Sequence, residues 1–201
     1  VDYAFARGVT VMPEFDVPGH ALAFRRAFGF ETMRDEGVRE KLCDLIDELC
    51  SLVPAERMPI IHLGSDEARL PEEKVPEKWM QPLVDRVIAN GRQVAGWVPG
   101  GLKRCDLKGR AIAMRWSRPK AEELAETKTT AAFDGGGYYV ETFDPFELLS
   151  VATYRKTCAW DPKDNAHAGV IACCWHDERA GSSRAVLTEQ TMVPAIAMLS
   201  D

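Results

Sequence analysis

Two adjacent carboxylates, Asp66 and Glu67, follow an apolar run in the stretch PIIHLGSDEARLP, residues 59–71. The run predicts a short buried strand that Gly64 and Ser65 bring to an end. Neighbouring side chains in a strand point to opposite faces, so both carboxylates can serve one site only if the backbone turns before them. One could then hold a substrate while the other transfers a proton. The alternative is that the pair caps the next helix, where acidic side chains favour the helix dipole.

A second group of polar side chains follows another apolar run, in VMPEFDVPGHA at residues 11–21. Glu14, Asp16 and His20 lie here, and the Pro-Gly pair before the histidine predicts a turn. A histidine or a second carboxylate near a catalytic acid can set its pKa and its orientation. Asp16 and His20 are therefore candidate substrate-binding residues. The alternative is that His20 only forms a hydrogen bond within its own loop.

Aromatic residues gather at the ends of the predicted strands and in the following loops. A tryptophan taken alone ordinarily belongs to a packed core. As a group, these residues predict an aromatic-walled pocket that suits the apolar faces of a sugar ring, with nearby acids accepting hydrogen bonds from its hydroxyl groups. The aromatic candidates are Trp97, Trp116, Tyr139, Trp160 and Trp175, and the acidic candidates are Glu141 and Asp177.

Composition argues against several other classes of function. The 201 residues are 46% hydrophobic, enough for a sizeable core, and the net charge of -6 argues against nucleic-acid binding. No apolar run approaches the roughly 18 residues of a membrane span. The six cysteines form no C-x-x-C pair and show no regular spacing with histidine, so we expect no metal and no other cofactor. His62, inside the predicted strand, is expected to be buried with its hydrogen bonds satisfied.

Helical patterns separate the apolar runs. The clearest has its apolar face between residues 38 and 53, with Asp35 as a candidate N-cap and Pro54 as its stop. Another is expected at 76–90, just before Gly91. Shorter helices are expected at about 119–127, at about 145–157 and at the C-terminal end.

Six predicted strands that alternate with helices indicate an α/β protein, either an open doubly wound sheet or a (β/α)₈ barrel. A barrel enzyme collects its catalytic residues at the carboxyl ends of many strands, and almost every strand here ends in Glu, Asp, Trp or Tyr. We therefore expect one domain over 1–201, a TIM barrel. Because such barrels typically have about 250 residues, we expect the chain to lack roughly the first two βα units.

Two stretches resemble the signature motifs of a known family. PEFDVPGHA at 13–21 and HLGSDEA at 62–68 are similar to those of glycoside hydrolase family 20, the β-N-acetylhexosaminidases, whose catalytic domain is a (β/α)₈ barrel. The resemblance covers nearly the whole chain, as strands three to eight. It implies that Asp66 orients the 2-acetamido group of the substrate and that Glu67 is the general acid/base.

Four later stretches, GWVPG, MRWS, YYVE and CCWHDE, resemble further strand ends of the same family. They imply a lining of the sugar pocket, a hydrogen bond to the acetamide carbonyl and two acids that bind ring hydroxyls. In that order, the residues implied are Trp97, Trp116 and Trp175 for the lining, Tyr139 for the carbonyl, and Glu141 and Asp177 for the hydroxyls.

The chain departs from the family pattern at three motif positions. Ser65 stands where the family usually has a second glycine, and the elements Tyr-x-Asp and Trp-x-Glu read Tyr-Val-Glu and Trp-His-Asp. The two exchanges between Asp and Glu keep the charge but change the reach of the side chain by one methylene group, so the choice between gluco and galacto sugars stays open.

The implied activity is substrate-assisted, retaining hydrolysis of terminal β-linked N-acetylhexosamine (GlcNAc or GalNAc) from a glycan. The partner would be carbohydrate, with neither nucleic acid nor membrane. Two alternatives remain: a catalytically impaired glycan-binding module on the same barrel, and a barrel enzyme with metal-dependent chemistry. Because roughly the first two βα units are expected to be absent, the chain by itself is expected to show little or no hydrolysis. The compartment stays open.

Overall fold

The computed structural model describes residues 1–67, 76–102, 105–108, 111–116, 131–134 and 169–175. These residues fall into two compact units, which we describe separately. The described part of the first unit ends at Ala113, and that of the second begins at Met114. The expectation of a single domain over 1–201 stays a prediction.

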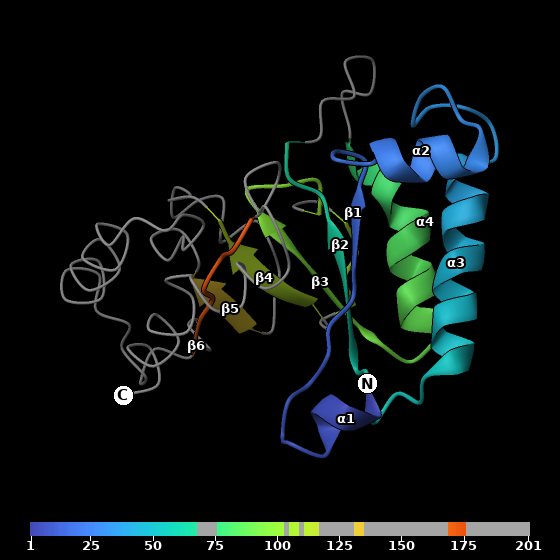
Figure 1. The fold of residues 1–201 in the computed structure, drawn as a ribbon. Helices are drawn as coiled ribbons and strands as arrows, with labels where there is room; N and C mark the ends of the chain where they lie inside the picture. The colour runs from blue at the N-terminus through green and yellow to red at the C-terminus, as the bar shows by residue number, and fades with distance from the viewer. Residues whose placement is uncertain (68–75, 103–104, 109–110, 117–130, 135–168, 176–201) are drawn as a thin grey trace, which may run out of the picture. The chain divides into compact units, whose positions relative to one another are not determined.

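The first unit is built from strands that alternate with helices (Figure 1). Its elements are α1 (Asp2–Phe5), β1 (Glu14–Val17), α2 (Leu22–Phe28), α3 (Val38–Leu52), β2 (Ile60–Gly64), α4 (Pro76–Ala89) and β3 (Gln93–Val98), followed by β4 (Ala111–Arg115), which crosses the division between the units. β1, β2, β3 and β4 are neighbours in chain order, and both β1 with β2 and β2 with β3 pair in parallel. The register places Glu14 opposite His62 and His62 opposite Ala95.

β2 is buried along nearly its whole length, as its continuous apolar sequence predicts. The neighbouring residues His62 and Leu63 point to opposite faces, and they are 1% and 0% exposed. α4 packs against β2 and β3, and α3 packs against α4. One apolar core therefore joins these helices to the sheet.

α3 and α4 form where the periodicity predicts helices, but the start of α3 differs from the expectation. Its N-cap is Gly37, in the left-handed conformation with φ 84°, and no side chain caps it. Asp35 instead accepts hydrogen bonds from the backbone N–H groups of Glu31 (2.6 Å) and Thr32 (3.1 Å). The expectation that Asp35 is the N-cap of α3 was therefore wrong, because the carboxylate of Asp35 closes the preceding turn.

A buried cation ties the helices to the sheet. Arg92 is 4% exposed, and its guanidinium donates hydrogen bonds to the carbonyl oxygens of Cys50 (3.3 Å) and Val53 (2.6 Å) at the end of α3. The expected turn at Gly91, with φ 74°, delivers Arg92 to this position directly after α4. The last carbonyls of α3 thereby gain charged donors.

The second unit contains β5 (Ala131–Asp134) and β6 (Gly169–Val170). They pair in parallel, with Phe133 opposite Gly169 and Asp134 opposite Val170. All six predicted strands are thus present. The helices expected at 119–127, at 145–157 and at the C-terminal end lie outside the described residues.

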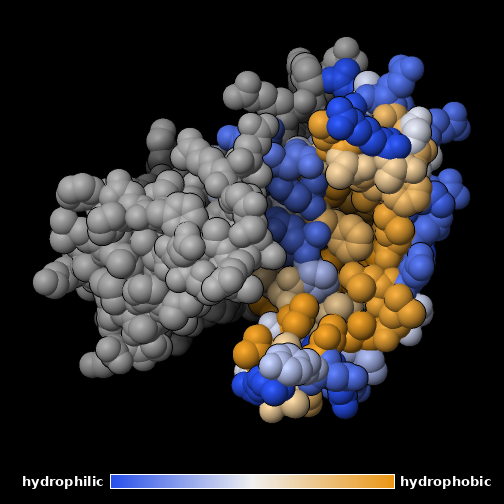
Figure 2. All heavy atoms as spheres, in the orientation of Figure 1, coloured by the Kyte–Doolittle hydropathy of each residue, from blue (hydrophilic) through white to orange (hydrophobic). Residues whose placement is uncertain are grey.

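The sequence analysis did not anticipate the short helix α2, which is only seven residues long and ends at Gly29 with φ 75°. Figure 2 shows hydrophobic residues gathered on the face of the first unit that carries β1 and the nearby helices, with hydrophilic residues at its edge. Tyr3, Phe5 and Leu22 are among the exposed large hydrophobic residues of the first unit. Within the described residues, no helix combines the length and apolar character that crossing a membrane requires.

Candidate active site

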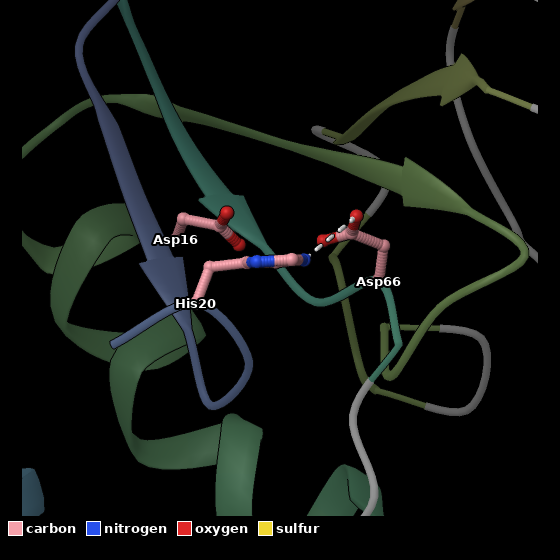
Figure 3. Close-up of side chains that lie close together, drawn as sticks. All are labelled: Asp16, His20 and Asp66. Carbon is pink, nitrogen blue, oxygen red and sulfur yellow. Dashed lines mark ion pairs between the residues drawn. The ribbon is translucent and has the colours of Figure 1, made fainter. Parts of the chain in front are cut away.

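The candidate site lies at the carboxyl ends of β1 and β2. Because these two strands are parallel neighbours, the segments that follow them meet at the same edge of the sheet. Asp16 and His20 come from the end of β1 and the turn after it, and Asp66 and Glu67 follow β2. Figure 3 shows the side chains of Asp16, His20 and Asp66 pointing toward one another.

The turn after β2 is what lets two neighbouring carboxylates reach one site. β2 ends at Gly64, and the backbone then takes positive φ values at Gly64 (60°), Ser65 (77°) and Glu67 (45°). Such values interrupt the alternation of a strand. The expectation that Gly64 and Ser65 end the strand before the acidic pair is confirmed. The next described helix is α4 (Pro76–Ala89), and residues 68–75 lie outside the described part of the chain, so the alternative that the pair caps a helix is not tested.

Gly64 has a second task, which is to let β1 approach closely. A Cβ atom at this position would lie 2.7 Å from the Cα of Asp16 and would also collide with Oδ1 of the same residue. Ser65, which is 0% exposed, anchors the turn: its N–H donates to Val17 O (3.1 Å), and its own carbonyl accepts from the N–H of Gly101 (2.8 Å).

His20 connects the two motifs. Its Nε2 lies 3.5 Å from Glu67 Oε2 and 3.9 Å from Asp66 Oδ2. Asp66 is the more buried of the two acids, with 17% of its side chain exposed against 55% for Glu67. His20 therefore does more than bond within its own loop, since it faces both carboxylates, and a protonated imidazole there would stabilise their charge.

Asp16 and Asp66 are close enough to share a hydrogen bond between their carboxyl groups. Burial, then the charges of Asp66 and Glu14, raise the pKa of Asp16 to about 7. The pKa of Asp66 is also raised, chiefly by burial, although His20 and the hydrogen bond from Asp16 act against that shift. The raised pKa values favour one proton shared by the two carboxyl groups, and that proton belongs to the pair and not to either residue alone.

The same three side chains contain donor atoms that a cation could use. One ligand atom each from Asp16, His20 and Asp66 lies within 4.8 Å of the other two. Carboxylate oxygen and imidazole nitrogen are ordinary ligands for divalent metals. Oδ1 of Asp16 and Oδ1 of Asp66 are buried and have no hydrogen-bond partner within the described residues. The expectation of no metal stays a prediction.

Behind the site lies a partly buried group that sequence reasoning did not assemble. Glu14 Oε1 accepts a hydrogen bond from Trp97 Nε1 (2.8 Å) and lies 3.0 Å from His62 Nδ1. The His62 and Trp97 rings meet edge to face with their centroids 4.7 Å apart. Burial raises the pKa of Glu14, but the hydrogen bonds from His62 and Trp97 and the charge of His62 outweigh it, so the pKa is lowered.

His62 is buried, as expected, but its hydrogen bonds are only partly satisfied. Its Nδ1 lies 3.0 Å from both the backbone N of Gly64 and Oε1 of Glu14, so it can accept from the first or, when protonated, donate to the second, but not both at once. Its Nε2 is buried and has no hydrogen-bond partner within the described part of the chain. The sequence could have indicated that Glu14 lies near the site. Glu14 stands two positions before Asp16, and residues two apart in a strand share a face.

The remaining sequence candidates fall elsewhere. Trp97 ends up 5% exposed and bonded to Glu14, in the first unit. Trp116 and Trp175 belong to the second unit, where Trp116 directly follows β4 and Trp175 is 39% exposed. Four candidates lie outside the described residues: Tyr139, Glu141, Trp160 and Asp177.

Comparison with known proteins points to one family. Residues 1–42 match the family model described as glycosyl hydrolase family 20, catalytic domain. A β-N-acetylhexosaminidase from Cellulomonas fimi is 28% identical over 112 residues, which is 46% of this chain and 22% of that protein.

Solved structures agree on the fold. The family 20 β-N-acetylhexosaminidase from Streptomyces coelicolor matches with a TM-score of 0.66 and 22% identity, over 99% of this chain and 48% of that one. The β-N-acetylhexosaminidase from Bacteroides fragilis matches with a TM-score of 0.64 and 22% identity, over 88% and 44%. The chain thus spans under half the length of these relatives, and its fold is that of part of a (β/α)₈ barrel.

Proposed function

The chain contains part of a glycoside hydrolase family 20 catalytic domain, and from this premise we propose that the protein removes terminal β-linked N-acetylhexosamine from glycans. The observation that carries the proposal is the meeting of Asp16, His20, Asp66 and Glu67 at the carboxyl ends of two neighbouring parallel strands. In a barrel enzyme, this edge is where catalysis takes place.

The two neighbouring carboxylates have different tasks in the proposed reaction. Most retaining glycosidases use one carboxylate as nucleophile and a second as acid/base, but this family is an exception in which the substrate assists. The acetamido oxygen of the sugar attacks C1 while Glu67 donates a proton to the leaving oxygen. The bond from C1 to that oxygen breaks, and a cyclic oxazolinium ion forms.

Glu67, now a carboxylate, then removes a proton from the water molecule that attacks C1 and opens the ring. Two inversions at C1 give a product with retained configuration. His20 supports this cycle because its Nε2, 3.5 Å from Glu67 Oε2, can hold the carboxylate in place and stabilise it when charged.

Asp66 faces the positive charge that develops on the acetamido nitrogen. A charged carboxylate placed in advance stabilises the transition state most where little water competes with it, and Asp66 is mostly buried. The neighbouring Asp16 supports this role, because a hydrogen bond from its carboxyl group opposes the rise that burial causes in the pKa of Asp66.

The experiment that tests the proposal compares substrates with and without the acetamido group. We expect rapid hydrolysis of an aryl β-N-acetylglucosaminide, far slower hydrolysis of the matching β-glucoside, and competitive inhibition by a thiazoline analogue of the cyclic intermediate. Comparable rates on the two substrates would favour an enzyme nucleophile and contradict the proposal. Hydrolysis of neither substrate by a folded, full-length protein would favour the glycan-binding alternative.

A further inference from the structure

The group formed by Glu14, His62 and Trp97 has no part in the roles proposed above. It draws one side chain from each of three neighbouring parallel strands, β1, β2 and β3 (Figure 1). The register sets Glu14 opposite His62, and Trp97 stands two positions after Ala95, the residue opposite His62. Because residues two apart in a strand share a face, all three side chains lie on one face of the sheet.

One hydrogen bond in this group spans the middle strand. Trp97 Nε1 donates to Glu14 Oε1 (2.8 Å), so a side chain from β3 reaches one from β1 across β2. The His62 ring contacts both partners, since it meets the Trp97 ring edge to face and its Nδ1 lies 3.0 Å from the same carboxylate oxygen. An indole N–H can only donate, and Trp97 is 5% exposed, so loss of Glu14 would leave this donor without its charged acceptor where little water reaches.

The turn that carries the acidic pair is held by the same two outer strands. Ser65 donates to Val17 at the end of β1, and its carbonyl accepts from Gly101, which follows β3. The segment after β3 also packs closely here, since a Cβ atom at Gly100 would lie 2.8 Å from the carbonyl oxygen of Ser65. Asp66 comes directly after Ser65, so its position depends on how the ends of β1 and β3 are spaced.

The charge of Glu14 does not favour ionisation of the neighbouring acids. After burial and the charge of Asp66, it is the next cause of the raised pKa of Asp16. A carboxylate that opposes the ionisation of its neighbours costs free energy, so electrostatic support of the acidic pair does not account for its presence. The hydrogen bond to Trp97 offers the better account, because it ties together the two strands that hold the turn.

We propose that Glu14 is a positioning residue for the acidic pair: by binding Trp97 across β2, it fixes the ends of β1 and β3 and thereby the place of Asp66 relative to Asp16. We call this bond the Glu14–Trp97 brace. The inference rests on the proposed function and adds to it a residue that acts through another side chain. Loss of the brace should mainly lower kcat, because a misplacement of about 1 Å in a catalytic group can cost about 10²-fold in rate.

The test uses full-length protein and an aryl β-N-acetylglucosaminide, with kcat and KM determined separately. Glu14→Ala removes the acceptor of the brace, Trp97→Phe removes the donor but keeps an aromatic ring, and a double variant removes both. We expect each single variant to lower kcat about tenfold while KM changes less than about threefold. The double variant should lose little more, because both changes break the same bond, whereas independent effects would multiply to about a hundredfold.

Two further variants separate the brace from the charge of Glu14 and from a general loss of stability. Glu14→Gln keeps an acceptor oxygen for Trp97 without the charge, so it should stay within about threefold of the parent kcat. Trp79→Phe is the matched control, because Trp79 is also buried and its Nε1 donates to the carbonyl oxygen of Met33 (3.1 Å). It should leave kcat unchanged. Equilibrium unfolding in denaturant checks that every variant is folded under the assay conditions.

Three results would overturn the positioning role. If Glu14→Gln lowers kcat as much as Glu14→Ala, the charge matters and the bond does not. If the losses of Glu14→Ala and Trp97→Phe multiply in the double variant, the two residues act independently. If Trp79→Phe lowers kcat as strongly as Trp97→Phe, the effect is one of stability alone.

Failure of the proposed function gives a different result. An unmodified, folded full-length protein that does not hydrolyse the substrate would overturn the proposed function and the positioning role with it. If the unmodified protein is active and Glu14→Ala retains its kcat, the function stands and the positioning role alone fails.

Discussion

Replacement of Gly64 by alanine should separate β1 from β2 at the active site. The residue has φ 60°, where a side chain is strained, and its Cβ would lie 2.7 Å from the Cα of Asp16. That neighbour is backbone, so the clash cannot be relieved by rotation of a side chain. The strand that carries Asp16 must move instead.

The magnitude follows from these two costs. The left-handed conformation costs an L-residue roughly 1–2 kcal/mol. Overpacking a well-packed region adds about 1–3 kcal/mol. Gly64→Ala should therefore lower the free energy of unfolding by about 2–5 kcal/mol, a large part of the roughly 5–15 kcal/mol of a typical domain.

Gly91→Ala is the matched control. Gly91 has φ 74°, but no atom lies within 4 Å of the position its Cβ would take. It should show the conformational cost alone, about 1–2 kcal/mol. The assay is equilibrium unfolding in denaturant for the parent and both variants, with the m-values compared to confirm that the same transition is measured.

The difference between the two variants isolates the contact between β1 and β2. Equal destabilisation by Gly64→Ala and Gly91→Ala would refute the reasoning, because it would mean that Asp16 does not approach Gly64 as closely as described. A loss of hydrolysis in Gly64→Ala, with Gly91→Ala unaffected, would further support the placement of Asp16 beside Asp66.

Three further predictions concern the carboxyl groups. Glu67→Gln should reduce hydrolysis of an unactivated disaccharide by about 10²–10⁴ while sugar binding is nearly kept, because the amide keeps the shape but cannot donate the proton; a variant with more than about half the parent rate would contradict the assignment. Asp66→Ala should lower kcat and not merely raise KM, since the proposed contact of Asp66 strengthens as positive charge develops on the acetamido nitrogen. An effect on KM alone would mean that Asp66 binds the substrate and the transition state equally well. Asp16→Asn should become more stable relative to the parent as the pH rises from about 4 through 7, measured as the difference in unfolding free energy. The reason is that the raised pKa of about 7 lets the folded parent keep a proton that the unfolded chain releases near 3.8, so the parent loses stability in this window; a difference independent of pH would contradict the buried carboxyl pair.

Local sequence patterns determined much of this protein. The apolar runs predicted all six strands, and the helical periodicity predicted α3 and α4, because both signals arise from residues a few positions apart. The end of β2 was also readable, since Gly64 tolerates the positive φ that the turn requires. The acidic pair after that turn was therefore identifiable as a candidate site from sequence alone.

Local patterns failed where one short segment offered several solutions. The carboxylate of Asp35 could cap either the following helix or its own turn, and the turn was chosen because Glu31 and Thr32 present two N–H groups to it. α2 was not anticipated because seven residues are too few for a clear period.

Only the tertiary structure decided which side chains meet. His20 faces Glu67, and Glu14 bonds to Trp97, because parallel pairing brings together the ends of strands that lie far apart in the chain. The raised pKa of Asp16 has the same origin, since burial and the charge of Asp66 act through space and not along the sequence. The sequence could place the acids at strand ends, but the register between the strands sets the distances over which they share a proton.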